Sequence, residues 1–390
     1  KRSDLHIADS NFGMYRQDIE TAKALRSVQE KYGYPQYINV ATGKNKKERV
    51  LEVARIVNGA MKLAGSVQSL DSEVLKNIKR SNIGVDQIME LGHSADQVGA
   101  NSYSEVILGL PGDSIASHFK TLETLVDAGF NTICMYQFMI LPGTESGSTE
   151  AQKEYSMTTR WRFLPRCYGY FDVLGEQINV AEAEEICVAN SSLSFEDYLN
   201  CRKMNFIVNV FYNDGVFREL LKFLNWEGLS IWKWLLTIYN GMGGHEKWAS
   251  LLQDFLKETE QELWPEREGL VENARSREKI KKYIDGRLGG NLMFKYKGLS
   301  MTQCLDDVAG VARDAARDIL RNSSAHSSDK ESFIDDLVRY NLCKMSDIFV
   351  EDPQDKSQYF TYDVERFSIS ENSKKITEFK FSKPKKLTFL

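Results

Sequence analysis

Short apolar runs alternate with helix-like segments over the first 145 residues, and this alternation restricts the fold more than any other feature. Four of the five runs are short and almost continuously apolar, which is typical of strands buried on both faces of a parallel sheet. The strand candidates are residues 5–8, 37–41, 61–67, 105–110 and 132–140. Between them, apolar side chains recur at helical spacing, as in 50–57 and 115–126. The repeated order of strand and helix predicts a parallel α/β sheet or barrel.

The rest of the chain has a different character, and we expect it to form two further parts. Aromatic residues are frequent between 206 and 234, which indicates a helical accessory domain packed on the barrel. Within this domain we expect a linker or first helix over 181–189 and a charged helical segment over 266–290. We then expect, in order, a helix over 301–321, a polar loop over 322–330 and short strands from Tyr359. The predicted domains are 1–150, 151–290 and 291–390.

Composition excludes several classes of protein. Apolar residues make up 42% and charged residues 27% of the chain, as in ordinary globular proteins, and the net charge of −5 does not favour nucleic-acid binding. The six cysteines form no CxxC pattern, which argues against a metal knuckle and indicates a reducing compartment. No signal peptide is visible, and the most apolar stretch, 229–239, is too short to span a bilayer. We therefore predict a cytoplasmic protein that binds neither nucleic acid nor membrane.

Both ends of the chain resemble internal segments of a longer protein. The first residues run almost at once into a strand-like segment, and the last four, 387–390, provide no polar tail. We therefore expect this chain to be a fragment.

Polar residues directly after the strands are the first candidates for a site, because active sites of parallel βα barrels form at the carboxyl ends of the strands. Asp9, Ser10 and Asn11 follow the first strand, and their short side chains suit a ligand amine or carboxylate. A turn that caps the next helix would use the same residue types, so both readings stay open.

The segment after the third strand carries an amide and a cation. Gln68 offers both a donor and an acceptor, which suits a pair of hydroxyl groups, and Ser69 stands beside it. Arg80 could pair with a carboxylate in a bidentate manner. In the alternative reading, Asp71 only caps a helix and Arg80 is a solvated surface cation.

The fourth strand contains a carboxylate and leads into a glycine-rich turn. Glu105 stands inside an apolar strand, where an unpaired charge would be costly. Ile107 and Gly109 end this strand, and glycine lets the backbone approach a flat ligand. The simpler interpretation is a strand-to-helix turn capped by Asp113 or Ser114.

The last strand of the series ends in the turn that contains Pro142. No nucleophile–base pair and no phosphate-binding P-loop is visible, so catalytic residues stay unassigned and no metal ligand is predicted.

Four of these segments, taken in order, resemble strands two to six of a radical S-adenosylmethionine (radical SAM) barrel. The segments are ADSNFG (8–13), GSVQSLDSEVLKNIKRSN (65–82), SEVILGLPGDS (104–114) and MILPGTE (139–145). They are most similar to the branch that often carries an N-terminal cobalamin-binding domain, and the resemblance covers about residues 4–215. It implies an α/β fold with a partial parallel (βα)6 barrel, followed by a mainly helical accessory region and a small C-terminal extension.

The resemblance also gives roles to individual residues in binding S-adenosylmethionine (SAM). It places Asp9 and Asn11 at the methionyl amine and Gln68, with Ser69, at the ribose hydroxyls. Arg80 would reach the SAM carboxylate, and Glu105 would lie on the ribose side. The backbone from Ile107 to Gly109 and the turn at Pro142 would flank adenine.

The implied cofactors are SAM and a [4Fe–4S] cluster that reduces SAM to a 5′-deoxyadenosyl radical, with cobalamin expected only if an N-terminal domain exists. The CxxxCxxC loop that holds the cluster is missing from this sequence, as is the first strand, and we expect both upstream of Lys1. The end of the strand at 37–41 also lacks the acidic residue of some branches. The chain alone should then be inactive.

The partners implied are a small-molecule substrate and an electron donor such as flavodoxin or ferredoxin. Two other classes stay open at this point. One is a non-catalytic barrel that serves as a binding module. The other is a hydrolytic or aldol-type barrel, which should show a lysine, histidine or metal cluster at its strand ends; none is visible in the sequence.

Overall fold

A computed structural model describes residues 3–43, 46–80, 84–97, 100–345, 356–370 and 375–389. The chain divides into two compact units, and each is described by itself. Unit 1 comprises Lys1–Phe138, Thr149–Met157 and Ala189–Ser194. Unit 2 comprises Met139–Ser148, Thr158–Val188 and Phe195–Leu390.

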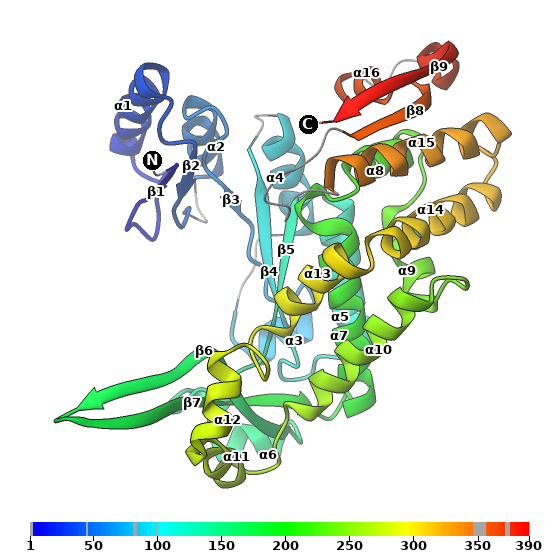
Figure 1. The fold of residues 1–390 in the computed structure, drawn as a ribbon. Helices are drawn as coiled ribbons and strands as arrows, with labels where there is room; N and C mark the ends of the chain where they lie inside the picture. Colours follow the sequence, from blue (N-terminus) through cyan, green and yellow to red (C-terminus); the bar gives the residue numbers. More distant parts are fainter. Residues whose placement is uncertain are drawn as a thin grey trace. The chain divides into compact units, whose positions relative to one another are not determined.

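Unit 1 contains the parallel sheet that the apolar runs predict (Figure 1). Its strands are β1 (Asp4–His6), β2 (Tyr37–Asn39), β3 (Leu63–Ala64), β4 (Ser102–Leu108) and β5 (Thr132–Gln137). β1 pairs with β2, β3 with β4 and β4 with β5, all in parallel. A parallel bridge between Ile38 and Met61 connects β2 to the start of the β3 segment. The prediction that these strands are parallel neighbours in chain order is confirmed; closure into a barrel stays a prediction.

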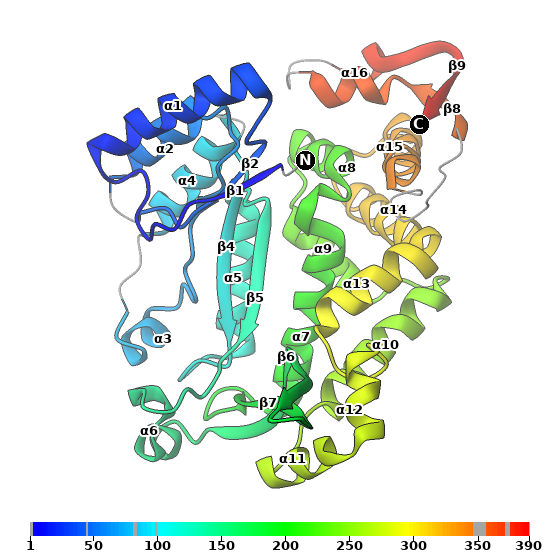
Figure 2. The same ribbon diagram turned by 60° about the vertical axis from the view of Figure 1, so that its left-hand side comes forward.

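Helices follow the strands of unit 1, as expected of βα units. They are α1 (Arg16–Tyr32), α2 (Lys47–Ile56), α3 (Ser72–Asn77), α4 (Val85–Gln97), α5 (Ile115–Asp127) and α6 (Thr149–Glu154). One face of the sheet is buried, and its side chains include Ile38, Leu63, Val106 and Leu108. Figure 2 shows α5 alongside β4 and β5. The opposite face of β4 and β5 is only half-buried, which leaves room for polar side chains there.

Unit 2 contains a long two-stranded element that the sequence did not lead us to expect. β6 (Thr158–Val173) pairs with β7 (Glu176–Ala189). The two-residue turn between them has positive φ at both Leu174 and Gly175, as a type I′ hairpin requires. The expectation of a linker or helix over 181–189 is therefore wrong, because this segment is strand. Exposed and less exposed side chains alternate over 178–183, and the apolar run Ile186–Ala189 ends the strand.

Helices form the rest of the region expected to be helical. They are α7 (Phe195–Ile207), η2 (Val208–Tyr212), η3 (Asn213–Gly215), α8 (Arg218–Trp226), α9 (Ile231–Asn240), α10 (Glu246–Gln261), α11 (Arg267–Arg275) and α12 (Arg277–Ile284). Aromatic side chains form their core: Phe206 stacks on Phe255 with ring centroids 4.4 Å apart, and Trp234 donates its indole N–H to the Ala312 carbonyl.

The C-terminal part of unit 2 mixes helices and strands, as predicted. It contains α13 (Leu292–Gln303), α14 (Leu305–Arg321), α15 (Ser328–Met345), β8 (Lys356–Tyr362), α16 (Val364–Ile369), η4 (Ile376–Phe379) and β9 (Lys380–Phe389). β8 and β9 pair antiparallel. The expected helix over 301–321 is interrupted, because Cys304 adopts non-helical backbone angles and separates α13 from α14. Within the described ranges, no helix is both long enough and apolar enough to cross a membrane.

Candidate functional site

The carboxyl ends of β3 and β4 lie side by side and bring two of the predicted residues together. The Gln68 N–H donates to the Glu105 carbonyl at 2.8 Å, and the Ile107 N–H donates to the Gln68 carbonyl at 2.9 Å. Gln68 has a φ of 59°, a left-handed conformation that costs a non-glycine residue about 1 kcal/mol or more. The backbone beyond β3 is thus held against β4 at the residue that the resemblance assigns to the ribose.

The Glu105 side chain is paired, which answers the objection to a carboxylate inside an apolar strand. The Ser66 hydroxyl donates to Glu105 Oε2 at 2.8 Å, and the Arg80 guanidinium donates to the Ser66 carbonyl at 3.3 Å. Burial lowers the pKa of Arg80, and the nearby charge of Glu105 opposes that shift. A hydroxyl, a carboxylate and a guanidinium therefore gather at the end of β3, and Arg80 is not an isolated surface cation.

Asp71 acts as a helix cap, as the simpler reading of this segment held. Asp71 accepts hydrogen bonds from the N–H groups of Glu73 and Val74 and caps α3. Ser69 is buried, and its hydroxyl accepts from the Asp71 N–H at 3.2 Å. Ser69 thus supports the turn through its hydroxyl.

The turn after β4 is built around a buried carboxylate. Asp113 accepts from the Gly109 N–H at 3.2 Å and from the Ser117 hydroxyl at 2.7 Å, and Ser114 caps α5. Burial raises the pKa of Asp113, although His118 and these hydrogen bonds act in the opposite direction. Gly112 has a φ of 80°, so glycine is required at this point of the turn. The turn fixes the backbone from Ile107 to Gly109.

Asp9 and Asn11 lie in an exposed turn after β1. The Asn11 N–H donates to Asp9 Oδ1 at 2.7 Å, and the Asn11 amide donates to the Ser10 hydroxyl. Phe12, next in the chain, bridges to Thr42 beyond β2, and the Ala64 N–H of β3 donates to the Thr42 hydroxyl at 3.3 Å. The turn therefore leads to the same edge of the sheet as the β3 end. The contact of Asp9 and Asn11 with a SAM amine stays a prediction.

Pro142 belongs to unit 2, where its turn is attached to the hairpin. The Ile140 N–H donates to the Glu185 carbonyl of β7 at 2.8 Å, and the Thr144 hydroxyl donates to the Leu141 carbonyl. The assignment of Pro142 to the adenine stays a prediction.

Sequence reasoning missed three residues on the half-buried face of the sheet. The strand register places Tyr103 and Glu105 of β4 on the same face as Cys134 and Tyr136 of β5. The pKa values of both tyrosines are raised, first by burial and then by neighbours that include Glu105 and Cys134. The available sequence signal was the alternation of the two strand faces along 103–107 and 132–136. It was missed because both segments also fit strands that are apolar on both faces. These side chains line the face on which Glu105 lies.

Metal ligation gives no further candidate. In the part of the chain that the structure describes, no group of three or more His, Cys, Asp or Glu side chains could hold a metal ion. Accordingly, the arrangement around Gln68 and Glu105 can bind hydroxyl and carboxylate groups of a ligand through hydrogen bonds and one cation.

Comparison with known proteins identifies relatives by sequence. No protein-family model matches the chain. It is 30% identical over 225 residues to the 2-(S-pantetheinyl)-carbapenam-3-carboxylate methyltransferase of Streptantibioticus cattleyicolor, a match that covers 57% of this chain and 32% of the relative. It is 29% identical over 228 residues to the cobalamin-dependent radical SAM methyltransferase TokK of Streptomyces tokunonensis, covering 57% and 33%. The chain spans about a third of the length of these curated relatives.

These relatives confirm the resemblance to the radical SAM superfamily. Both relatives are named as methyltransferases, and TokK is named as a cobalamin-dependent radical SAM enzyme. Solved structures of the radical SAM methyltransferase TsrM from Kitasatospora setae also match, one with cobalamin and a [4Fe–4S] cluster bound and one with tryptophan and a SAM analogue. Their sequence identities are 13% and 12% and their TM-scores 0.33 and 0.32, with 43% and 44% of this chain and 31% and 33% of those chains covered.

Proposed function

We propose that this chain is the SAM-binding part of a cobalamin-dependent radical SAM methyltransferase that acts on a small organic molecule. The observation that carries the proposal is the gathering of Ser66, Gln68, Arg80 and Glu105 at the ends of β3 and β4. These residues stand in the segments that resemble the superfamily, and the names of the relatives supply the reaction class.

The groups present suit the ribose and carboxylate of SAM. Among the described residues, one hydrogen bond engages the Glu105 carboxylate, at Oε2, so Oε1 is left to accept from a ribose hydroxyl. The Gln68 amide supplies a donor and an acceptor for the same hydroxyl pair. Arg80 supplies the cation for the methionyl carboxylate, with the planar geometry that carboxylates match.

The remaining predicted residues complete the proposed site. Asp9 and Asn11 bind the methionyl amine, Ser69 supports the Gln68 turn, and the Ile107–Gly109 backbone flanks adenine. Pro142 is assigned to the other side of the adenine ring.

The radical chemistry itself belongs to cofactors, and the sequence shows no ligand motif for them. In the superfamily, an iron–sulfur cluster supplies the electron for SAM cleavage. The sequence has no CxxxCxxC motif, so no step is assigned to the cluster within this chain. We infer that a flavodoxin or ferredoxin supplies that electron to the whole enzyme.

SAM affinity, measured by isothermal titration calorimetry on the chain and its variants, tests the proposal. Each hydrogen bond contributes about 1–3 kcal/mol, and the cost of immobilising the ligand offsets much of the sum. We therefore expect weak binding by this chain, of the order of 100 μM or weaker. Gln68→Ala and Glu105→Gln should each weaken binding about tenfold, a loss of about 1.4 kcal/mol.

Matched controls separate a lost contact from a general effect. Gln17→Ala and Glu52→Gln change the same residue types on the exposed surfaces of α1 and α2 and should leave SAM affinity unchanged. If Gln68→Ala and Glu105→Gln bind SAM as the unmodified chain does, the ribose site is wrong. If the unmodified chain shows no binding at millimolar SAM, the reading of the chain as a non-catalytic barrel gains support.

A further inference from the structure

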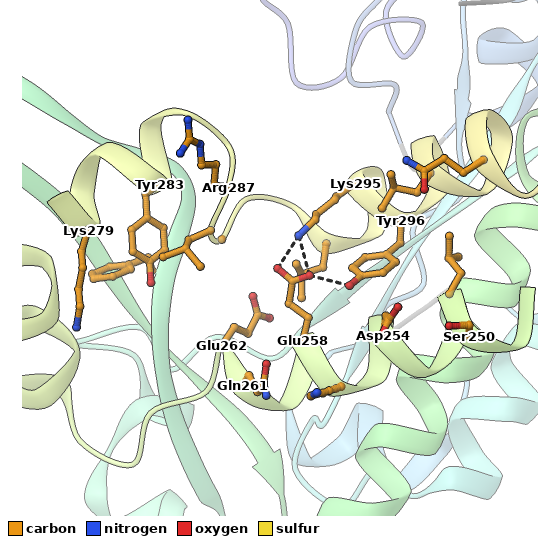
Figure 3. Close-up of a pocket in the computed structure, with 18 of the residues that line it drawn as sticks. Ser250, Asp254, Glu258, Gln261, Glu262, Lys279, Tyr283, Arg287, Lys295 and Tyr296 are labelled. Carbon is orange, nitrogen blue, oxygen red and sulfur yellow. Dashed lines mark hydrogen bonds and ion pairs between the residues drawn. The ribbon is translucent and has the colours of Figure 1, made fainter. Parts of the chain in front are cut away.

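Unit 2 contains a groove of about 1180 Å³ that lies between α10, α12 and α13 (Figure 3). Its volume is slightly above the range typical of small-molecule sites, about 300–1,000 Å³. The groove shares no residue with the proposed SAM site.

One part of the groove is built from carboxylates and a tyrosine. Asp254 and Glu258 of α10 and Glu262, the residue directly after this helix, follow one another at four-residue spacing, so they form one stripe along the groove. Glu258 accepts two hydrogen bonds from the Lys295 ammonium and one from the Tyr296 hydroxyl, all at 2.7 Å. The arrangement shows how an ammonium group fits this wall: it rests on a carboxylate while its nitrogen lies 5.4 Å from the Tyr296 ring centroid.

Two of the three carboxylates in the stripe are neutralised by cations of the protein. Lys295 pairs with Glu258, and Arg162 pairs with Glu262 at 2.9 Å. For Asp254, the described part of the chain supplies no hydrogen bond and no ion pair, and Figure 3 shows this side chain next to Tyr296. Asp254 is therefore the group at which an additional cation would gain most.

The other part of the groove is apolar and aromatic. Phe163, Trp264, Leu270, Tyr283 and Leu288 line it. Phe163 and Tyr283 meet edge to face with ring centroids 5.0 Å apart, so this wall is fixed by packing. Glu262, which borders it, lies eight residues beyond Asp254, about 12 Å along the α10 axis. A ligand that touches both parts must be elongated.

We propose that this groove binds an elongated amphipathic organic cation, with its ammonium group against Asp254 and Glu258 and its apolar or aromatic body against Tyr283 and Leu288. The raised pKa values of Tyr296 and Tyr283 agree with this polarity. Burial is the largest cause for both, and the carboxylates of Glu258 and Asp254 raise the first while that of Glu262 raises the second. Four further cations line the groove and oppose a bound cation: Lys247, Lys257, Lys279 and Arg287. A neutral alcohol of the same shape is therefore the reference for the ammonium compound.

Three probes of one shape distinguish charge from shape: phenylbutylamine, phenylbutanol and phenylbutyrate, each with the phenyl ring at the far end of the four-carbon chain. Calorimetric titration of the full chain should give the tightest binding for the ammonium compound, about fivefold tighter than for the alcohol, as expected of one exposed charge pair. The carboxylate compound should bind most weakly. Equal affinities for all three, preference for the carboxylate, or no binding of the amine at millimolar concentration would each overturn the proposal.

Substitutions locate the two ends of the ligand. Asp254→Asn should remove the preference for the amine over the alcohol, and Leu288→Ser should weaken both compounds about equally. Glu260→Gln, an exposed carboxylate on α10 outside the groove, and Ile369→Ser, an apolar residue that is 86% exposed on α16, are the matched controls and should change neither affinity. An unchanged preference in Asp254→Asn would show that the cation lies elsewhere and would refute the assignment.

Discussion

Arg162 joins three elements of unit 2 through one buried guanidinium, and its removal should be among the most damaging single changes there. Its Nε lies 2.6 Å from a Glu184 oxygen on β7, and its Nη1 lies 2.9 Å from a Glu262 oxygen just after α10. The exposed side-chain fractions are 12%, 5% and 13% for Arg162, Glu184 and Glu262. Burial by itself would lower the pKa of Arg162, but the two carboxylates outweigh it and raise that pKa.

The size of the effect follows from what Arg162→Met leaves behind. Two buried carboxylates lose their shared cation, and breaking a buried pair in this way costs about 3–5 kcal/mol. The buried Arg202 guanidinium, whose Nε and Nη1 have no hydrogen-bond partner in the described part of the chain, is close enough to interact with Glu262. It offsets part of the loss, so the value should lie near the lower limit, about 3 kcal/mol. In a chain of 390 residues that corresponds to a fall in Tm of roughly 4 °C.

Thermal unfolding followed by circular dichroism at neutral pH measures the effect. Replacing all three side chains with neutral ones, in Arg162→Met/Glu184→Gln/Glu262→Gln, removes the unpaired charges and should recover part of the lost stability. Arg275→Met is the matched control, because Arg275 and its partner Glu272 are 73% and 70% exposed and such pairs contribute little. The reasoning is refuted if the triple variant is less stable than Arg162→Met, or if Arg162→Met behaves like the control.

Two further predictions concern the turn after β4. A carboxyl group with a raised pKa holds its proton more tightly in the folded state. The contribution of Asp113 to the free energy of unfolding should therefore decrease as pH rises from about 3.9 through the raised pKa, and be constant above it. Urea unfolding as a function of pH should show a smaller dependence of this free energy on pH in Asp113→Asn, and an unchanged dependence would contradict the prediction. Gly112→Ala should destabilise the chain by about 1–3 kcal/mol, because φ is 80° and a Cβ would lie 2.7 Å from Asn77 Nδ2. Gly84→Ala is the control in the same urea titration, because a Cβ there would meet no atom of the described residues within 4 Å.

The sequence was sufficient to predict the parallel strands because each is a short apolar run with a helix after it. It was insufficient for the β6–β7 hairpin, where charged and aromatic residues alternate, as in Arg160, Trp161, Arg162 and Phe163. That alternation and the two-residue turn at Leu174–Gly175 were the available signals. The aromatic content of the following residues favoured the helical interpretation instead, which was correct only after residue 195.

Within the candidate site, local features could be predicted and pairings across strands could not. The caps at Asp71 and Ser114 follow from residue types that satisfy free N–H groups at a helix start. The bond between Ser66 and Glu105 joins residues 39 apart and depends on the register of β3 against β4, which no local pattern specifies. The same holds for Cys134 and Tyr136, which face Glu105 only because β5 pairs in register with β4.

The pairing of Glu105 with Ser66 also bears on why a carboxylate stands in this strand at all. One neutral hydrogen bond and a partly buried cation compensate for only part of the cost of moving a carboxylate out of water, so an apolar residue at this position would be the more stable choice. Its neighbours on the same face, Tyr103 and Ile107, show that larger and less polar side chains fit there. Glu105 thus costs stability, and it lies next to the strained backbone of Gln68. Both features are best explained by a ligand that binds Glu105 Oε1, the oxygen that has no partner among the described residues. The stability of the strand is thereby linked to the proposed SAM site, and Glu105→Leu tests this link: stability should be unchanged or higher, while SAM binding is lost.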